Sequence, residues 1–160
     1  LELGYQWPEA WATPWLRAGI NSGSGDANPR DGTHGTFFQM IPSTPYTAPF
    51  PFYNMMNNQD LFAQILLRPL ANVGLRADFH ALSVNAPQDL YYTGSGASSN
   101  TDFGYFGSPT FGASSLAYLV HIGASVYLSE QLTLNTFYGH AFGGKRSCSA
   151  TIPTPTVISA

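Results

Sequence analysis

Three arginines are the side chains of this sequence best suited to bind a solute. Arg17, Arg68 and Arg76 are half of its six basic residues, and each falls in a segment where polar and apolar residues alternate. A guanidinium group binds a carboxylate through two parallel hydrogen bonds, so arginines on three neighbouring strands could attract anionic solutes. Acidic residues share their face, and an internal network of Asp60, Asp78 and His80 with the arginines, bracing a wall, is an equally good interpretation.

A polar loop motif is the second candidate site. It consists of Ser24, Gly25, Asp26, Asn28, Asp31 and Gly32. Oxygen ligands at alternate positions suit a hard cation such as Ca²⁺, but Arg30 stands where a calcium loop needs a ligand, and no glutamate follows at the required spacing. A turn rich in Asp, Asn, Pro and Gly is the plainer interpretation, so we predict no metal and no other cofactor.

Catalysis has little support in the sequence. The histidines at 34, 80, 121 and 140 lie in four separate segments, and no nucleophile elbow accompanies them. The single cysteine, Cys148, lacks the spaced partners of a zinc site. We therefore do not expect an enzyme.

The composition indicates a membrane environment. Only 9% of the 160 residues are charged, against about 25% in a typical soluble domain. The net charge of −3 argues against a nucleic-acid partner. No apolar run reaches the roughly 18 residues of a membrane-spanning helix, so strands would have to cross the bilayer. Outer-membrane lipid is therefore an expected partner.

Period-two alternation predicts the strands that position the candidate residues. We expect strands near residues 1–6, 15–23, 60–69, 74–85, 116–128 and 132–142. Arginine facing lipid at mid-bilayer would cost roughly 2–4 kcal/mol, so the polar faces should line the interior. The predicted substrate path comprises Arg17, Asn21, Asp60, Gln64, Arg68, Arg76, Asp78 and His80.

Strand lengths and connections favour an outer-membrane barrel. Most of the alternating runs are about as long as the roughly 9–11 residues that a tilted strand needs to cross a bilayer. Short breaks at 70–73 and 129–131 alternate with long connections at 24–59 and 86–115, as periplasmic turns and extracellular loops do. The predicted fold is all-β, an antiparallel up-and-down transmembrane β-barrel of the bacterial outer membrane. Since such barrels have at least about eight strands, residues 1–144 should form an incomplete wall of about five to six long strands, followed by an irregular tail at 145–160.

Aromatic clusters predict where this wall meets the membrane surfaces. Aromatic girdles flank the apolar band of outer-membrane barrels. The expected periplasmic girdle is Trp7, Trp11 and Trp15, and the expected opposite girdle is Phe50, Phe52 and Tyr53.

Several motifs resemble the alginate export family of Gram-negative outer-membrane barrels. They are PWLRAG at 14–19, GSGDANPRDG at 23–32, GTFFQ at 35–39, PFYNMMNN at 51–58 and GHAFGG at 139–144. The resemblance implies a barrel of roughly eighteen strands, with this chain near its C-terminal end and the remaining strands as partners. It also implies an arginine-rich lumen that conducts a carboxylated polysaccharide passively, and loops that restrict the mouth. The tail after residue 144 departs from the expected final strand.

Two functions of different classes follow. The leading one is a segment of an outer-membrane channel that passes anionic or polar solutes, for example the polysaccharide alginate, by diffusion through an arginine-containing lumen. The alternative is a soluble or surface β-domain that binds glycans through exposed Trp11, Tyr91, Tyr92 and Tyr105. A soluble sandwich would hide its apolar stripe inside a second sheet, whereas a barrel wall would present these residues outward: Leu61, Ile65, Phe79, Val120 and Ile122.

Overall fold

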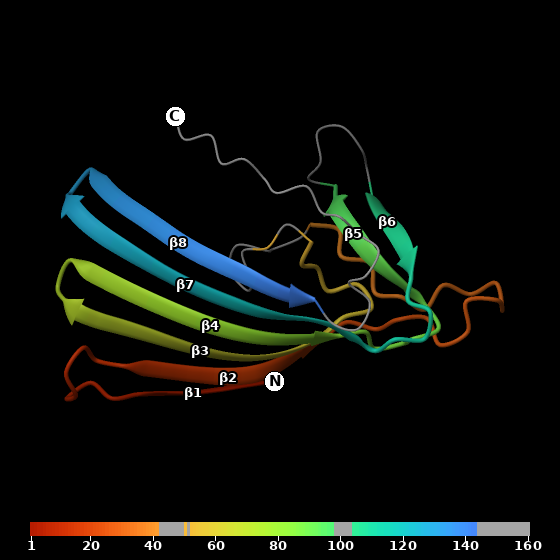
Figure 1. The fold of residues 1–160 in the computed structure, drawn as a ribbon, viewed down its shortest axis with the longest axis horizontal. Helices are drawn as coiled ribbons and strands as arrows, with labels where there is room; N and C mark the ends of the chain where they lie inside the picture. The colour runs from red at the N-terminus through yellow and green to blue at the C-terminus, as the bar shows by residue number, and fades with distance from the viewer. Residues whose placement is uncertain (42–49, 51, 98–103, 144–160) are drawn as a thin grey trace.

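The chain folds into antiparallel β-strands in the computed structural model, which describes residues 1–41, 50, 52–97 and 104–143 (Figure 1). The strands are β1 (Glu2–Gln6), β2 (Trp15–Ser22), β3 (Gln59–Leu70), β4 (Val73–Ser83), β5 (Leu90–Gly96), β6 (Gly104–Pro109), β7 (Ser115–Ser129) and β8 (Leu132–Gly143). Within the described ranges, no helix has the length and apolar character to cross a membrane. The predicted irregular tail at 145–160 lies outside them.

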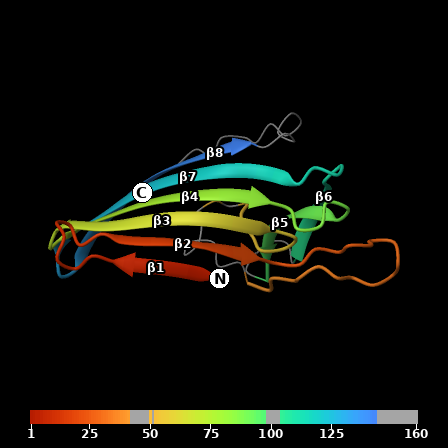
Figure 2. The ribbon, with the colours of Figure 1, turned by 90° about the horizontal axis from the view of Figure 1, so that it is seen from below.

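Six strands form one open sheet in the order β1-β2-β3-β4-β7-β8, and β5 pairs with β6 in a separate hairpin. Figure 2 shows the six strands side by side in this order. The all-β antiparallel fold is confirmed, and an unclosed sheet is consistent with an incomplete barrel wall. Each strand of this sheet starts and ends within two residues of its predicted range.

The two ends of the sheet differ in their connections. At the turn end, β3 joins β4 through residues 71–72 and β7 joins β8 through residues 130–131. At the loop end, residues 23–58 connect β2 to β3, and the β5–β6 hairpin with its flanking residues connects β4 to β7 (Figure 1). The long connections therefore gather at one end of the sheet.

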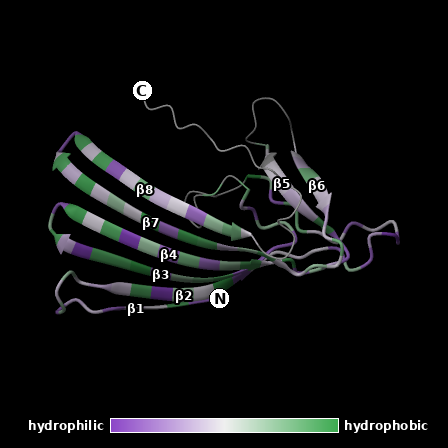
Figure 3. Cartoon of the chain, viewed as in Figure 1, coloured by the Kyte–Doolittle hydropathy of each residue, from purple (hydrophilic) through white to green (hydrophobic). Residues whose placement is uncertain are grey.

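The strand register sorts side chains onto two faces, because residues directly opposite each other on neighbouring strands share a face. Hydrophilic and hydrophobic residues alternate along the strands in Figure 3. The apolar face carries Leu16, Ile20, Leu61, Ile65, Leu75, Phe79, Val120 and Ile122. The polar face carries Glu2, Trp15, Arg17, Asp60, Gln64, Leu66, Arg76, Asp78, His80, His121, Gly123 and Phe137.

The hairpin β5–β6 corrects the prediction that residues 86–115 form one long loop. Its sequences, LYYTGSG and GYFGSP, are short and rich in glycine, so period-two alternation is lost. Gly94 and Gly96 have φ angles of 139° and 54°, and the register shifts between them. Such a bulge places an extra residue in one strand, which hides the strand from a pattern search.

Phe50, Phe52 and Tyr53 do not form the predicted girdle. Tyr53 is buried with Leu82, Ala117 and Leu119, and Phe50 and Phe52 pack against this cluster. By register, the three buried sheet residues lie on the polar face. The segment before β3 therefore turns back over the sheet, where its aromatic rings pack on the buried cluster and the Tyr53 hydroxyl donates to Asp60.

The tryptophans at the turn end are also divided between environments. Trp7 contacts Tyr5 edge to face, with ring centroids 4.7 Å apart. Trp15 is on the polar face instead, with the Arg17 guanidinium 5.1 Å from its ring centroid. Trp15 and Arg17 are two positions apart on β2, so strand alternation forces both to the same side. The predicted periplasmic girdle is thus wrong for Trp15.

Candidate functional site

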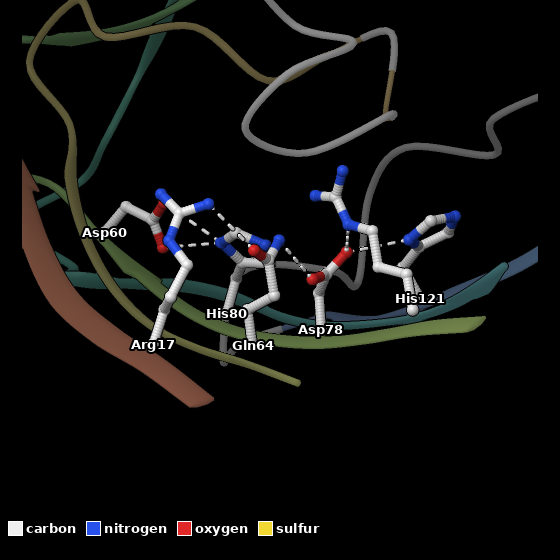
Figure 4. Close-up of polar contacts among 7 residues, drawn as sticks. Arg17, Asp60, Gln64, Asp78, His80 and His121 are labelled. Carbon is white, nitrogen blue, oxygen red and sulfur yellow. Dashed lines mark hydrogen bonds and ion pairs between the residues drawn. The ribbon is translucent and has the colours of Figure 1, made fainter. Parts of the chain in front are cut away.

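A hydrogen-bonded row of polar side chains crosses the middle of the polar face (Figure 4). Arg17, Gln64, Asp78 and His121 are register neighbours on β2, β3, β4 and β7. Arg17 Nη1 donates to Gln64 Oε1 at 2.9 Å, and Gln64 Nε2 donates to Asp78 Oδ1 at 2.7 Å. His121 Nδ1 lies 2.8 Å from Asp78 Oδ2. The sheet thus joins residues that are up to 104 positions apart in sequence into one network.

Two of the three arginines are neutralised within this row. Arg17 makes a bidentate pair with Glu2, at 2.7 Å from Nε to Oε1 and 2.8 Å from Nη2 to Oε2. Arg76 Nε lies 2.6 Å from Asp78 Oδ2. The Arg17 and Arg76 side chains keep 27% and 26% of their surface exposed, whereas that of Asp78 is fully buried. The network interpretation weighed from the sequence therefore describes both pairs, with Glu2 as a partner that was not anticipated.

Arg68 has different surroundings. Its side chain is exposed near the turn end, and it makes no ion pair within the part of the chain that the structure describes. Its backbone N–H donates to the carbonyl oxygen of Ala12 at 2.7 Å. Arg68 thus offers an uncompensated positive charge on this part of the wall.

A second cluster lies under the loop at the loop end. Asp60 accepts a hydrogen bond from the Tyr53 hydroxyl at 2.7 Å, and both of its carboxylate oxygens lie 3.0 Å from His80 Nδ1. Asp60 and His80 are 0% and 2% exposed, and His80 Nε2 has no hydrogen-bond partner among the described residues. Burial, followed by the Asp60 charge, raises the pKa of Tyr53 far above its ordinary value, so the hydroxyl remains a donor.

The predicted substrate-path residues therefore fall into two groups. Arg17, Gln64, Arg68, Arg76 and Asp78 lie toward the middle and the turn end of the polar face. Asn21, Asp60 and His80 lie at the loop end, where Asp60 and His80 are buried beneath the loop. His121, which completes the network, was not among the predicted residues, although its alternation with apolar neighbours on β7 was visible.

The loop motif folds into a set of capped turns. The Asp26 carboxylate accepts hydrogen bonds from the backbone N–H of Asn28 at 2.9 Å and of Gly35 at 3.4 Å. Asp31 caps the N–H of Thr33 in the same way, at 2.8 Å. The remaining motif residues have backbone roles: the Ser24 hydroxyl donates to the Gly35 carbonyl, Gly25 packs directly against Asn57, and Gly32 has a φ of 77°. Among the described residues, no group of three or more His, Cys, Asp or Glu side chains could hold a metal ion.

The Asn57 side chain joins two loops by hydrogen bonds. This residue was not identified from the sequence. Its side-chain amide donates to the carbonyl oxygens of Ala86 at 3.0 Å and Leu90 at 2.9 Å, and its Oδ1 accepts from the Ala86 N–H at 2.7 Å. The residue is fully buried, with a φ of 47° that asparagine tolerates better than most side chains. The three asparagines in YNMMNN were the available signal, because each can satisfy backbone groups of an irregular loop.

Asp89 is a second anchor of the loops. Burial alone would raise its pKa, but its hydrogen bonds from Thr36, from the backbone of Asp26 and Leu90, and from Tyr92 outweigh that effect and lower the pKa below its ordinary value. The carboxylate is therefore held in its charged form by two donors from the connection between β2 and β3 and two from β5. Nothing in the local sequence distinguishes Asp89 from a solvated loop residue.

Three of the four aromatics proposed for glycan binding are committed to the fold. The hydroxyls of Tyr91, Tyr92 and Tyr105 donate to the Phe52 carbonyl, the Asp89 carboxylate and the Gln39 carbonyl, respectively.

The large side chains of the apolar face are exposed. Leu61, Phe79 and Ile122 are 58%, 45% and 56% exposed, and Ile65 and Val120 are partly exposed. Among the described residues, no second sheet covers these apolar side chains.

The family model for alginate export matches residues 1–147. The chain belongs to the alginate export family. The resemblance noted in the sequence is thereby confirmed. The alginate export family is a transport family, and its members are typically outer-membrane β-barrels. No curated protein and no solved structure matches the chain. The alginate export family thus provides the functional context for the polar face described above.

Proposed function

We propose that this chain forms part of the wall of an outer-membrane channel through which anionic or polar solutes, including an exported polysaccharide, diffuse passively. The observation that supports the proposal is that polar and apolar side chains lie on opposite faces of the sheet. Large apolar side chains such as Leu61, Phe79 and Ile122 are exposed together on one face, and a contiguous apolar surface of this kind needs hydrocarbon or another protein to cover it. Lipid would contact that face, and water and solute would contact the polar face.

The edges of the sheet support the same proposal. β1 and β8 each have only one neighbouring strand among the described residues. Unpaired backbone N–H and C=O groups are costly in a bilayer, where no water can satisfy them. Further strands of a parent barrel would pair with β1 and β8 and close the wall.

The loop end would narrow the interior of this channel. Phe50 reaches the polar face of β8, where a Cβ added to Gly139 would lie 3.1 Å from its ring. Tyr53 covers Asp60 on β3. The loop before β3 therefore spans the polar face from β3 to β8, and a solute would pass beside it.

Planar-bilayer recording of the intact barrel tests this function. We expect stepwise conductance that is reduced by Gly123→Trp, because position 123 is on the polar face and a large side chain there would narrow the lumen. The matched control, Ala124→Trp, projects from the apolar face and should leave the conductance unchanged. Absence of conductance steps, or equal effects of the two variants, would contradict the proposal.

A further inference from the structure

The polar face contains a groove toward the turn end, which we call the turn-end groove. It has a volume of about 830 Å³, and its lining includes Arg68, Arg76, His121, Gly123 and Phe137. Gly123 keeps its centre open, because a Cβ there would already lie 3.3 Å from the His121 ring. Arg68 is exposed and makes no ion pair within the part of the chain that the structure describes, so the groove already has one uncompensated positive charge.

The hydrogen bond to Asp78 determines which nitrogen of a neutral His121 carries the proton. His121 Nδ1 lies 2.8 Å from Asp78 Oδ2, and an ionised carboxylate can only accept hydrogen bonds. Nδ1 must therefore be the donor, which leaves the lone pair of the neutral imidazole on Nε2. Figure 4 shows this second ring nitrogen pointing away from Asp78.

The Nε2 atom of His121 is accessible from the turn-end groove. It has no hydrogen-bond partner among the described residues and, unlike Nε2 of His80, it is not a buried atom. A Cβ added to Gly123 would lie 3.5 Å from it. Nε2 is thus placed where a proton or a solute can reach it.

On the side of β4 and β3, the imidazole faces one acid and the partners of that acid. Asp78 is the acid that pairs with His121, and Arg76 Nε lies 2.6 Å from the same carboxylate. Gln64 separates this carboxylate from Arg17, which has its own acidic partner. While His121 is neutral, the charges of Arg76 and Asp78 cancel. A proton on Nε2 gives the three side chains together a net positive charge.

On the side of β8, no carboxylate faces the imidazole among the described residues. Gly139 is its register neighbour, with the Phe50 ring over it, and the Phe137 ring centroid lies 5.9 Å from that of the imidazole. Arg68 and Tyr127 are the other titratable side chains of the described groove lining. Neither has a carboxylate that could pair with a protonated imidazole, so the added charge stays available to a solute.

We propose that His121 is a specificity-determining residue of the channel, whose protonation on Nε2 adds a positive charge to the turn-end groove and strengthens the binding of anionic solutes as pH falls. This inference rests on the proposed channel function and adds a regulation to it. Histidine is the side chain that commonly changes its charge between about pH 5 and 8. Neutral His121 accepts a hydrogen bond from a solute hydroxyl, whereas protonated His121 donates a charge-assisted hydrogen bond to a solute carboxylate.

Blockage of the channel current by a charged oligosaccharide at two pH values tests the proposal. In the intact barrel, a hexamer of mannuronate should block the current about fivefold more strongly at about pH 5.5 than at about pH 8, because one positive charge is added beside its path. Carboxylates titrate near about pH 4, so the hexamer stays charged at both values. Maltohexaose, which is uncharged, should block equally at both.

Two variants of His121 and one control separate its charge from other effects of pH. His121→Gln should keep the weaker block at both pH values. His121→Lys has a fixed positive charge and should show the stronger block at both, a gain that a misfolded protein could not imitate. His140→Gln, on the apolar face of β8, should leave the pH dependence unchanged.

Three results would overturn the role of His121 and leave the channel function intact. They are a wild-type block that does not depend on pH, a pH dependence that persists in His121→Gln, and a weak block by mannuronate at both pH values in a conducting His121→Lys channel. A wild-type protein without any conductance would overturn the channel function as well.

Discussion

The loop end and the turn end of the polar face are built from the same strands and differ in what covers them. At the loop end, the segment before β3 packs on the sheet, so Leu119 and His80 are 0% and 2% exposed. At the turn end, the polar face is open, and Phe137 on β8 is 71% exposed. One face of one sheet therefore has a covered region and an open region.

This difference separates stability from solute binding. Side chains under the loop have their hydrogen bonds satisfied by protein, and their loss would leave buried groups unpaired. Side chains at the turn end of the polar face keep exposed surface for a solute, and most substitutions of exposed residues cost little stability. Substitutions at the loop end should therefore change unfolding, whereas substitutions at the turn end should change conduction.

The largest effect is expected for Gly23→Ala at the loop end. An added Cβ would lie 1.8 Å from the Met55 carbonyl oxygen, which is backbone and cannot rotate away. The loop would have to detach, and we expect the free energy of unfolding in detergent to fall by about 3 kcal/mol. Gly74→Ala is the matched control, because its Cβ would meet no atom within 4 Å. Equal stability of the two variants would show that Met55 does not pack against Gly23, at the end of β2, as described.

A smaller but clear loss is expected for Asn57→Ala. The substitution removes three hydrogen bonds and leaves the carbonyl oxygens of Ala86 and Leu90 without this donor in a buried site. The expected cost is about 2 kcal/mol in urea unfolding. Asn28→Ala, in an exposed part of the preceding loop, should change stability by less than about 0.5 kcal/mol. A similar cost for both variants would show that the hydrogen bonds of Asn57 do not stabilise the loops.

A pH-dependent effect is expected from Asp89. Its pKa is lowered from the ordinary value of 3.8, so its ionised form contributes stability above pH 3.8, and this contribution is lost as pH falls toward the lowered value. The difference in unfolding free energy between wild type and Asp89→Asn should thus be constant near neutral pH and shrink below pH 3.8. A difference that grows on acidification would reverse the assigned direction.

The smallest effect on stability is expected for Arg68→Gln at the turn end. Arg68 is exposed and has no ion-pair partner in the described parts of the chain, so the unfolding free energy should change by less than about 0.5 kcal/mol. Its charge is nevertheless uncompensated, so the reversal potential in a salt gradient should shift toward lower anion selectivity. Arg17→Gln should shift it less, because Glu2 already neutralises Arg17. The opposite order would indicate that the ion pair is open in the channel.

The sequence predicted the strands of the sheet because each alternates over a long run without interruption. The face assigned to each side chain followed from residue type, because leucine and arginine cannot share a surface that contacts lipid. In β3, for example, Leu61 and Arg68 fall on opposite faces. The pairing of Arg17 with Glu2 was not predictable, since it depends on the register between β1 and β2. The seating of Tyr53 on Asp60 and the roles of Asn57 and Asp89 depend on how a long loop folds back, which local patterns do not encode.

The central claim is that the apolar face meets hydrocarbon while the polar face meets water. Spin labels placed one at a time along β3, at positions 61 to 67, in the intact barrel reconstituted in lipid test it most directly. The account predicts that labels at odd positions collide with oxygen dissolved in the bilayer, and that labels at even positions collide with a water-soluble nickel complex. Accessibility that does not alternate, or that alternates in the opposite phase, would contradict the account.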